Sequence, residues 1–177
     1  MTDYLLKTKR LGLRNWTQSD IAPFVAMGKD PEVMRYFPSV LTKQESVAFI
    51  ERIQEHFILH GFCYFAVDVL ETGEFIGFTG MLHQNFSSPY TPNVDLGWRL
   101  KKSAWSQGYA TEAANACIEA AFTTFGLAKV VAFAPSSNVA SQRIMEKIGM
   151  RYLGDFQHPK LRDDPRFSHC VAFGKSR

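Results

Sequence analysis

Apolar residues recur at helical spacing in two stretches of the first sixty residues. The longer stretch begins at Thr42, which can form a capping box with Glu45. Behind this box the apolar positions recur at helical spacing, at Val47, Ile50, Ile53, Phe57 and Ile58. Gly61 is a typical helix end, so we predict that this helix stops there. A shorter helix is predicted from Thr17, a suitable N-cap, to about Gly28.

Other runs alternate polar and apolar residues or are rich in β-branched residues, as strands are. The predicted strands are Thr8–Arg14, Cys63–Leu70, Phe75–Leu82, Val94–Leu100, Lys129–Ala134, Met150–Phe156 and His169–Phe173. The four residues Glu71–Glu74 read as a hairpin turn between two of them. Two more helices are predicted over Tyr109–Phe125 and Asn138–Ile148, and a glycine follows each. This order predicts a mixed α/β (α+β) fold in one domain over residues 1–177.

Composition and charge exclude several classes of protein. The chain has 15 Phe, 6 Tyr and 3 Trp and a formal net charge of +3, which excludes a disordered chain. Its 20 Lys and Arg stand against 17 Asp and Glu without clustering on one predicted helix, so we expect no nucleic-acid partner. No apolar run approaches the roughly 20 residues of a membrane span. The first residues also lack the apolar stretch of a secretory signal, and we expect no membrane partner.

The cysteine pattern predicts a reduced protein without a metal site. Cys63, Cys117 and Cys170 are odd in number, far apart and unlike any zinc spacing. We therefore expect free, buried thiols in a cytoplasmic protein. Cys117 lies within a predicted apolar helix and no Cys/His pair is suggested by spacing, which disfavours a covalent acyl-enzyme.

The segment Val94–Ala113 is the most informative for chemistry. A strand runs through a short loop into a helix that begins around Gly108. Backbone N–H groups at a helix start are unsatisfied donors, and the helix dipole favours an anion such as a pyrophosphate there. Lys101 and Lys102 on the loop can add positive charge. This segment alone favours the plainer interpretation, in which Gly108 only makes a tight strand-to-helix turn and both lysines are solvated.

A second segment, Asn138–Met150, follows the next predicted strand. Asn138 can cap its own helix, and this structural role is sufficient to explain it. Ser141 lies in the first turn, where a hydroxyl can bond a backbone carbonyl or simply face solvent.

Taken together, these segments resemble the GCN5-related N-acetyltransferases (GNAT), and within them the RimJ/RimL-like branch of ribosomal-protein N-terminal acetyltransferases. The resemblance rests on Asp95-Leu-Gly-Trp98, on Trp105-Ser-Gln-Gly108-Tyr-Ala110-Thr-Glu-Ala113, and on Asn138-x-x-Ser141 with Glu146-Lys-x-Gly149-Met150. The segments Thr8–Arg14 and His169–Phe173 are similar to that branch too. The resemblance implies a mixed central sheet of about seven strands flanked by about four helices and splayed at the cofactor site.

The same resemblance implies an acetyl-CoA site and no metal. The strand edge at Trp98, Arg99 and Leu100 would bind the pantetheine arm. The amides at the helix start, those of Gln107, Gly108, Tyr109, Ala110 and Thr111, would bind the pyrophosphate. Asn138 matches the position that hydrogen-bonds the pantetheine arm, and Ser141 the position of a hydroxyl near the coenzyme sulfur.

Two positions depart from the family pattern. Trp105 stands where the wider family has Gln or Arg, so one phosphate contact differs. Met145 stands where many relatives have a tyrosine acid, and a thioether cannot donate a proton, so the role passes to Ser141 or to solvent. Asp95 is the best candidate for the base, directly or through water, although a structural carboxylate on the strand face is equally consistent. Glu112 is interpreted as a charge that complements the helix dipole.

The predicted function is direct transfer of acetyl from acetyl-CoA to a primary amine, such as a ribosomal or other protein N-terminus. The alternatives are a small amine (a polyamine, an amino acid or an antibiotic) and a non-catalytic acyl-CoA-binding module. Aromatic residues of two loops, Tyr36, Phe37, Phe86 and Tyr90, can wall an acceptor pocket or simply close the edge of the domain. We expect a monomer or a homodimer.

Overall fold

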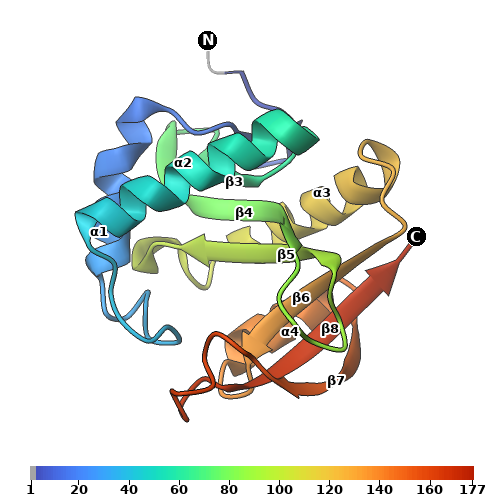
Figure 1. Ribbon diagram of the computed structural model, residues 1–177. Helices are drawn as coiled ribbons and strands as arrows, with labels where there is room; N and C mark the ends of the chain where they lie inside the picture. Colours follow the sequence, from blue (N-terminus) through green and yellow to red (C-terminus); the bar gives the residue numbers. More distant parts are fainter. Residues whose placement is uncertain (1–2) are drawn as a thin grey trace.

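The computed structural model describes residues 3–177, which form one eight-stranded sheet and four α-helices (Figure 1). The strands are β1 Leu6–Lys7, β2 Leu11–Arg14, β3 Tyr64–Val69, β4 Glu74–Gln84, β5 Asn93–Leu100, β6 Lys129–Pro135, β7 Arg151–Gln157 and β8 His169–Ser176. The helices are α1 Ile21–Lys29, α2 Lys43–His60, α3 Tyr109–Thr123 and α4 Val139–Lys147. The predicted α/β class and its four helices are confirmed.

The helix signals in the sequence act as expected at α2. The Glu45 amide donates to Thr42 Oγ1 at 3.1 Å, and the Thr42 amide donates to Glu45 Oε2 at 2.7 Å. Gly61 ends the helix in the left-handed region at φ 76°. Thr17 begins a 3-10 turn over Gln18–Asp20, and α1 follows it directly.

The structure adds an eighth strand because Thr8–Arg14 is not one continuous strand. The Thr8 amide donates to the Leu11 carbonyl at 2.9 Å, and the Leu11 amide donates to Thr8 Oγ1 at 2.9 Å. The chain therefore turns back at residues 8–10, and the two-residue β1 pairs antiparallel with β2. This turn carries Arg10 to the start of α3, where it matters for the site.

The strand order is β1-β2-β3-β4-β5-β6-β8-β7. Neighbouring strands are antiparallel except β5 and β6, which are parallel because α3 crosses over between them. Eight residue pairs join β4 to β5, whereas β5 and β6 pair only at Asp95 and Val131. Beyond Asp95 the two strands separate (Figure 1), so among residues 3–177 the β5 edge from Leu96 to Leu100 has no ladder partner on that side. The predicted splay is therefore present.

Helices cover both faces of the sheet and give the splay two distinct sides. Phe49 of α2 packs on Tyr64 and Phe78, with ring centroids 6.4 and 5.2 Å apart. In the register, Phe78 of β4 pairs with Arg99 of β5, and Tyr64 of β3 is in line with Gly97 of β5 across Gly80 of β4. The odd-numbered β5 residues Asp95, Gly97 and Arg99 therefore face α1 and α2, because side chains alternate along a strand. α3 packs on the opposite face (Figure 1).

All three cysteines are buried and free. Burial raises the pKa of the Cys63 and Cys117 thiols well above the usual range, and raises that of Cys170 to about 11. A thiol that stays protonated is a poor nucleophile, which agrees with the expectation of no acyl-enzyme. Within residues 3–177, none of the helices has the length and apolar character that spanning a membrane requires.

Candidate functional site

The start of α3 presents open backbone donors next to the splay. Gly108, the residue before the helix, has φ 78°, and Ser106 has φ 61°. These left-handed conformations make the sharp turn that aims the chain into α3. Within the described part of the chain, no side chain caps this helix start, and Gln107 and Gly108 are exposed. The amides of residues 107–111 are therefore available to an anion, as the predicted pyrophosphate site requires.

Arg10 is a basic residue at this site that the sequence did not indicate. Its Nη1 donates to the Gln107 carbonyl at 2.9 Å, and its guanidinium carbon lies 4.6 Å from the centroid of the Tyr109 ring. Its Nε donates to Glu112 Oε2 at 2.7 Å. Arg10 thus braces the turn before α3, and its side chain remains 42% exposed. The signal for it lies in tertiary structure, because only the turn between β1 and β2 brings it here.

Glu112 has a larger role than complementing the helix dipole. Its Oε1 accepts from Thr8 Oγ1 at 2.6 Å and from the Arg10 amide at 2.9 Å. Burial acts to raise the pKa of Glu112, but the hydrogen bonds from Thr8 and Arg10 outweigh it and hold that pKa below the usual value. The carboxylate therefore stays charged and fastens the turn between β1 and β2 to the first turn of α3.

The two loop lysines are paired with carboxylates. Lys101 Nζ forms an ion pair with Glu74, and Lys102 Nζ lies 3.7 Å from Glu32 Oε2. Trp105, which replaces the family's Gln or Arg, donates from its indole nitrogen to the Leu100 carbonyl at 2.8 Å. Trp105 thus fixes the loop to the end of β5 and offers no charge to a phosphate.

The edge of β5 that the sequence resemblance assigns to a pantetheine arm is open. Trp98, Arg99 and Leu100 lie beyond the single β5–β6 pair, so their backbone groups on that side are free of the ladder. Trp98 and Leu100 project toward the α3 face, and Arg99 toward the face of α1 and α2. The donors at the α3 start and the open edge of β5 together fit a ligand with a pyrophosphate and an amide-bearing arm.

Asp95 lies at the vertex of the splay, as the β5 member of the single β5–β6 pair. It is 8% exposed, and its carboxylate accepts from the Tyr64 hydroxyl at 2.8 Å and from Gln84 Nε2 at 3.1 Å. Burial raises the pKa of Asp95 to about 6, although the hydrogen bonds from Tyr64 and Gln84 act to lower it. A carboxyl with that pKa is suited to accept a proton near neutral pH. Gly97 makes room for Tyr64, since a Cβ there would lie 2.9 Å from its hydroxyl oxygen.

Asn138 and Ser141 lie together at the start of α4. Asn138 is the N-cap, and its Oδ1 accepts from the Ser141 amide at 3.1 Å. The Asn138 side chain therefore has the structural role that sequence reasoning left open. The Ser141 hydroxyl is partly buried and has no hydrogen-bond partner among residues 3–177. Met145 is buried in the core, and its thioether has no proton to donate.

The aromatic residues of the two loops separate into different environments. Phe86 and Tyr90 pack with Phe156 in a small cluster between β7, β8 and the loop before β5. They close an edge of the domain, which favours the structural alternative for these two. Phe37 instead lies over Arg99, with 4.1 Å between the guanidinium carbon and the ring centroid. Phe37 thus lies over β5, where a wall residue could contact an acceptor.

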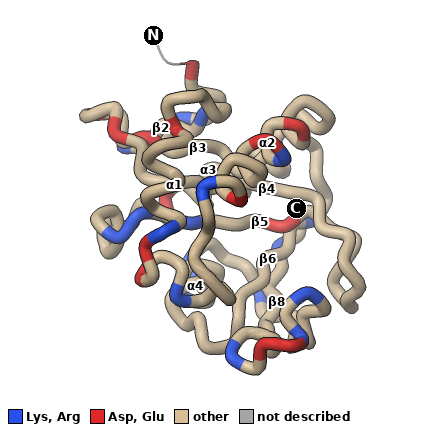
Figure 2. The backbone as a smooth tube through the Cα atoms, turned by 60° about the vertical axis from the view of Figure 1, so that its left-hand side comes forward, with Lys and Arg blue, Asp and Glu red and all other residues tan. Residues whose placement is uncertain are grey.

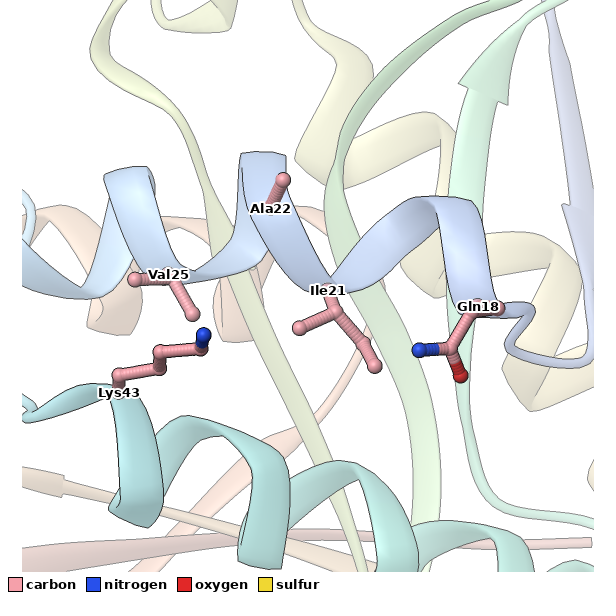
Figure 3. A pocket seen from close by; sticks show the side chains of 5 residues that line it. All are labelled: Gln18, Ile21, Ala22, Val25 and Lys43. Carbon is pink, nitrogen blue, oxygen red and sulfur yellow. The ribbon is translucent and has the colours of Figure 1, made fainter.

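A shallow groove on the surface lies outside this site. The groove lies between α1 and α2 and is lined by Gln18, Ile21, Ala22, Val25 and Lys43 (Figure 3). It offers one cation and no carboxylate, histidine, thiol or hydroxyl.

Lys and Arg are interspersed with Asp and Glu along the backbone (Figure 2), which agrees with the near-neutral charge of the chain.

Comparison with known proteins identifies the family. Residues 10–151 match the acetyltransferase (GNAT) domain. The uncharacterized protein YkkB of Bacillus subtilis is 31% identical over 148 residues, which cover 83% of this chain and 85% of YkkB. An acetyltransferase structure from Agrobacterium tumefaciens has a TM-score of 0.81 at 26% identity and covers 100% of this chain and 96% of its own. Spermidine N-acetyltransferase from Vibrio cholerae, in complex with CoA and spermine, has the same fold, with a TM-score of 0.74, 15% identity and 96% of each chain covered. The chain belongs to the GNAT family of acetyl-CoA-dependent N-acetyltransferases.

Proposed function

We propose that this protein transfers acetyl from acetyl-CoA directly to a primary amine at the vertex of the β5–β6 splay. The observation that carries the proposal is the placement of Asp95. This buried carboxyl lies where β5 leaves β6, and the free edge of β5 and the uncapped start of α3 follow it along the chain. A proton acceptor, a strand edge and an anion site thus follow one another on a single segment.

The reaction needs three things from the protein. A neutral amine must lose a proton as its nitrogen bonds to the thioester carbon, and Asp95 is assigned as the group that accepts this proton, directly or through a water. Donors must stabilise the charge that develops on the thioester oxygen. The C–S bond then breaks, and the departing thiolate takes a proton, for which Ser141 or a water that it holds is the assigned donor.

For the acceptor we propose a peptide N-terminus, as in the RimJ/RimL-like branch. The support is the match of Asp95–Trp98, Thr8–Arg14 and His169–Phe173 to that branch. A small amine is the second candidate. We place the protein in the cytoplasm, in keeping with its free cysteines.

The test combines binding with turnover. Acetyl-CoA is expected to raise the melting temperature, and a thiol assay is expected to detect CoA release with at least one member of a panel of peptides and small amines. Stabilisation without turnover on the whole panel would favour the non-catalytic binding module. Absence of stabilisation would contradict the proposed acetyl-CoA site.

Substitution of Ser141 by alanine is expected to lower kcat by about 10- to 100-fold. This is at or below the lower end of the roughly 10²- to 10⁴-fold range for a general acid, because water can substitute for the hydroxyl. The Kd for acetyl-CoA should change less than about threefold, since one neutral hydrogen bond contributes little. Steady-state kinetics and calorimetric titration separate these quantities. The matched control is Ser137→Ala, an exposed hydroxyl in the turn before α4. Equal kcat in both variants would assign Ser141 a structural role.

A further inference from the structure

Three of the five histidines meet at one place outside the acetyl-transfer site. His56 and His60 lie one turn apart at the end of α2, and His83 lies on β4. One ligand nitrogen from each falls within 4.8 Å of the other two. His56 Nε2 and His83 Nδ1 are 3.0 Å apart, and the ring of His60 lies 4.4 Å from that of His56 and 4.3 Å from that of His83.

The hydrogen bond at Nδ1 of His56 favours its Nε2 as a metal-ligand atom. Its Nδ1 lies 2.8 Å from the Phe62 carbonyl, which can only accept, so the proton is assigned to Nδ1. The lone pair of His56 is then on Nε2, which points to the other two rings. Metal-bound histidines commonly donate their second nitrogen to a carbonyl in this way.

We propose that His56, His60 and His83 bind a divalent transition-metal ion of the zinc, nickel or copper class. Neutral imidazole suits these ions, and two histidines four residues apart on a helix present both rings on one face. Tetrahedral coordination places ligand nitrogens about 3.3 Å from one another, given bonds of about 2.05 Å, so only small ring rotations are needed. The metal replaces the hydrogen bond that the His83 amide now donates to His56 Nε2 at 3.1 Å. Since His60 and His83 are exposed, solvent water completes the coordination.

The test titrates Zn²⁺ and Ni²⁺ into protein without a histidine tag, after removal of metals with a chelator. One ion per chain is expected by calorimetry, together with a higher melting temperature. His60→Gln and His83→Gln, which remove exposed ligands at little risk to folding, should each weaken binding by about tenfold or more. His169→Gln is the matched control, because that histidine is also exposed and pairs with Asp155 on β7. Equal affinity of all three variants, or no saturable binding by the unaltered protein, would overturn the site.

A separate observation concerns Arg99. The Nε and Nη1 atoms of its guanidinium are buried and have no hydrogen-bond partner among residues 3–177. Phe37 and Phe78 lie against the group, at 4.1 and 5.4 Å from the guanidinium carbon to each ring centroid. Within the same residues no carboxylate lies at ion-pair distance from it, and burial lowers its pKa to about 10, so it remains charged at neutral pH. Buried N–H groups of a charged side chain normally have an acceptor.

We infer that Arg99 receives a carboxylate of the amine acceptor, an inference that rests on the proposed function. Arg99 and Asp95 face the same side of the sheet, toward α1 and α2, and the Nε and Nη1 atoms of Arg99 are buried there. A carboxylate is the group that best matches a guanidinium. The source is either an acidic side chain near a peptide N-terminus or the carboxyl group of a small amino acid.

The test compares acceptors in matched pairs: peptides with glutamate or glutamine next to the N-terminal residue, and an amino acid with its amide. Binding is measured in the presence of CoA, which cannot acetylate, and turnover in the presence of acetyl-CoA. In at least one pair, the carboxylate form should bind about tenfold tighter or more than its amide counterpart, and Arg99→Gln should abolish that preference. Equal binding of both forms, or a preference that persists in Arg99→Gln, overturns the role of Arg99. Carboxylate-dependent binding without turnover instead contradicts the proposed catalysis.

Discussion

Replacement of Gly108 by glutamate is expected to weaken acetyl-CoA binding by about 100-fold or more. Gly108 is exposed at the uncapped start of α3, where the neighbouring amides are free. A glutamate side chain there places a negative charge and bulk where a pyrophosphate must approach those amides. Loss of charge-assisted hydrogen bonds, each contributing about 1.5–3 kcal/mol, accounts for a change of this size. Calorimetric titration with acetyl-CoA measures it.

The control separates blocked binding from backbone strain. Gly108 has φ 78°, so any side chain there costs about 1–2 kcal/mol of stability. Gly126, beyond the other end of α3, has φ 63° with open space around its Cα, so Gly126→Glu imposes similar strain far from the helix start. Both variants should lose similar melting temperature, and only Gly108→Glu should lose acetyl-CoA affinity. Retained affinity in Gly108→Glu would show that the pyrophosphate does not bind at this helix start.

Local sequence signals located the elements of this fold well where a short-range interaction determines them. Thr42 and Glu45 cap α2 through contacts within one turn, and Gly61 and Gly108 adopt the left-handed conformations that few other residues tolerate. The prediction of one continuous first strand was wrong. Thr8–Arg14 alternates as a strand does, but a hydrogen bond between Thr8 and Leu11 turns the chain. Alternation cannot reveal a tight turn that contains neither glycine nor proline.

The parts of the site that sequence did not predict depend on contacts between distant segments. Arg10 and Glu112 are 102 positions apart, and only the packing of the turn between β1 and β2 on α3 joins them. Lys101 and Lys102 lie next to the proposed anion site along the chain, yet the structure pairs them with Glu74 and Glu32. In the same way, the spacing of His56 and His60 is visible in the sequence, whereas His83 joins them through the pairing of β3 with β4.

Replacement of Asp95 by asparagine is expected to lower kcat by about 10²- to 10⁴-fold, the range for loss of a general base. The amide keeps the size of the side chain, so acetyl-CoA should still raise the melting temperature. In the unaltered protein a base must be deprotonated to act, so kcat/KM should rise with pH through about 6, the pKa to which burial raises Asp95. If Asp95 is only structural, Asp95→Asn will retain most of its turnover and this rise.

The Tyr64 hydroxyl gives this assignment a second test, because a merely structural carboxylate would not respond to it in a pH profile. Tyr64 donates to Asp95 at 2.8 Å and acts to lower its pKa, so Tyr64→Phe leaves burial less opposed and should raise that pKa. The rising limb of kcat/KM should then move to higher pH. Both proteins are measured with the same acceptor, so the titration of the amine itself contributes equally to both pH profiles. Tyr152→Phe, which removes a tyrosine hydrogen bond to the exposed Asp155, is the matched control and should leave the limb in place. An unchanged limb in Tyr64→Phe would mean that the group titrating near pH 6 is not Asp95.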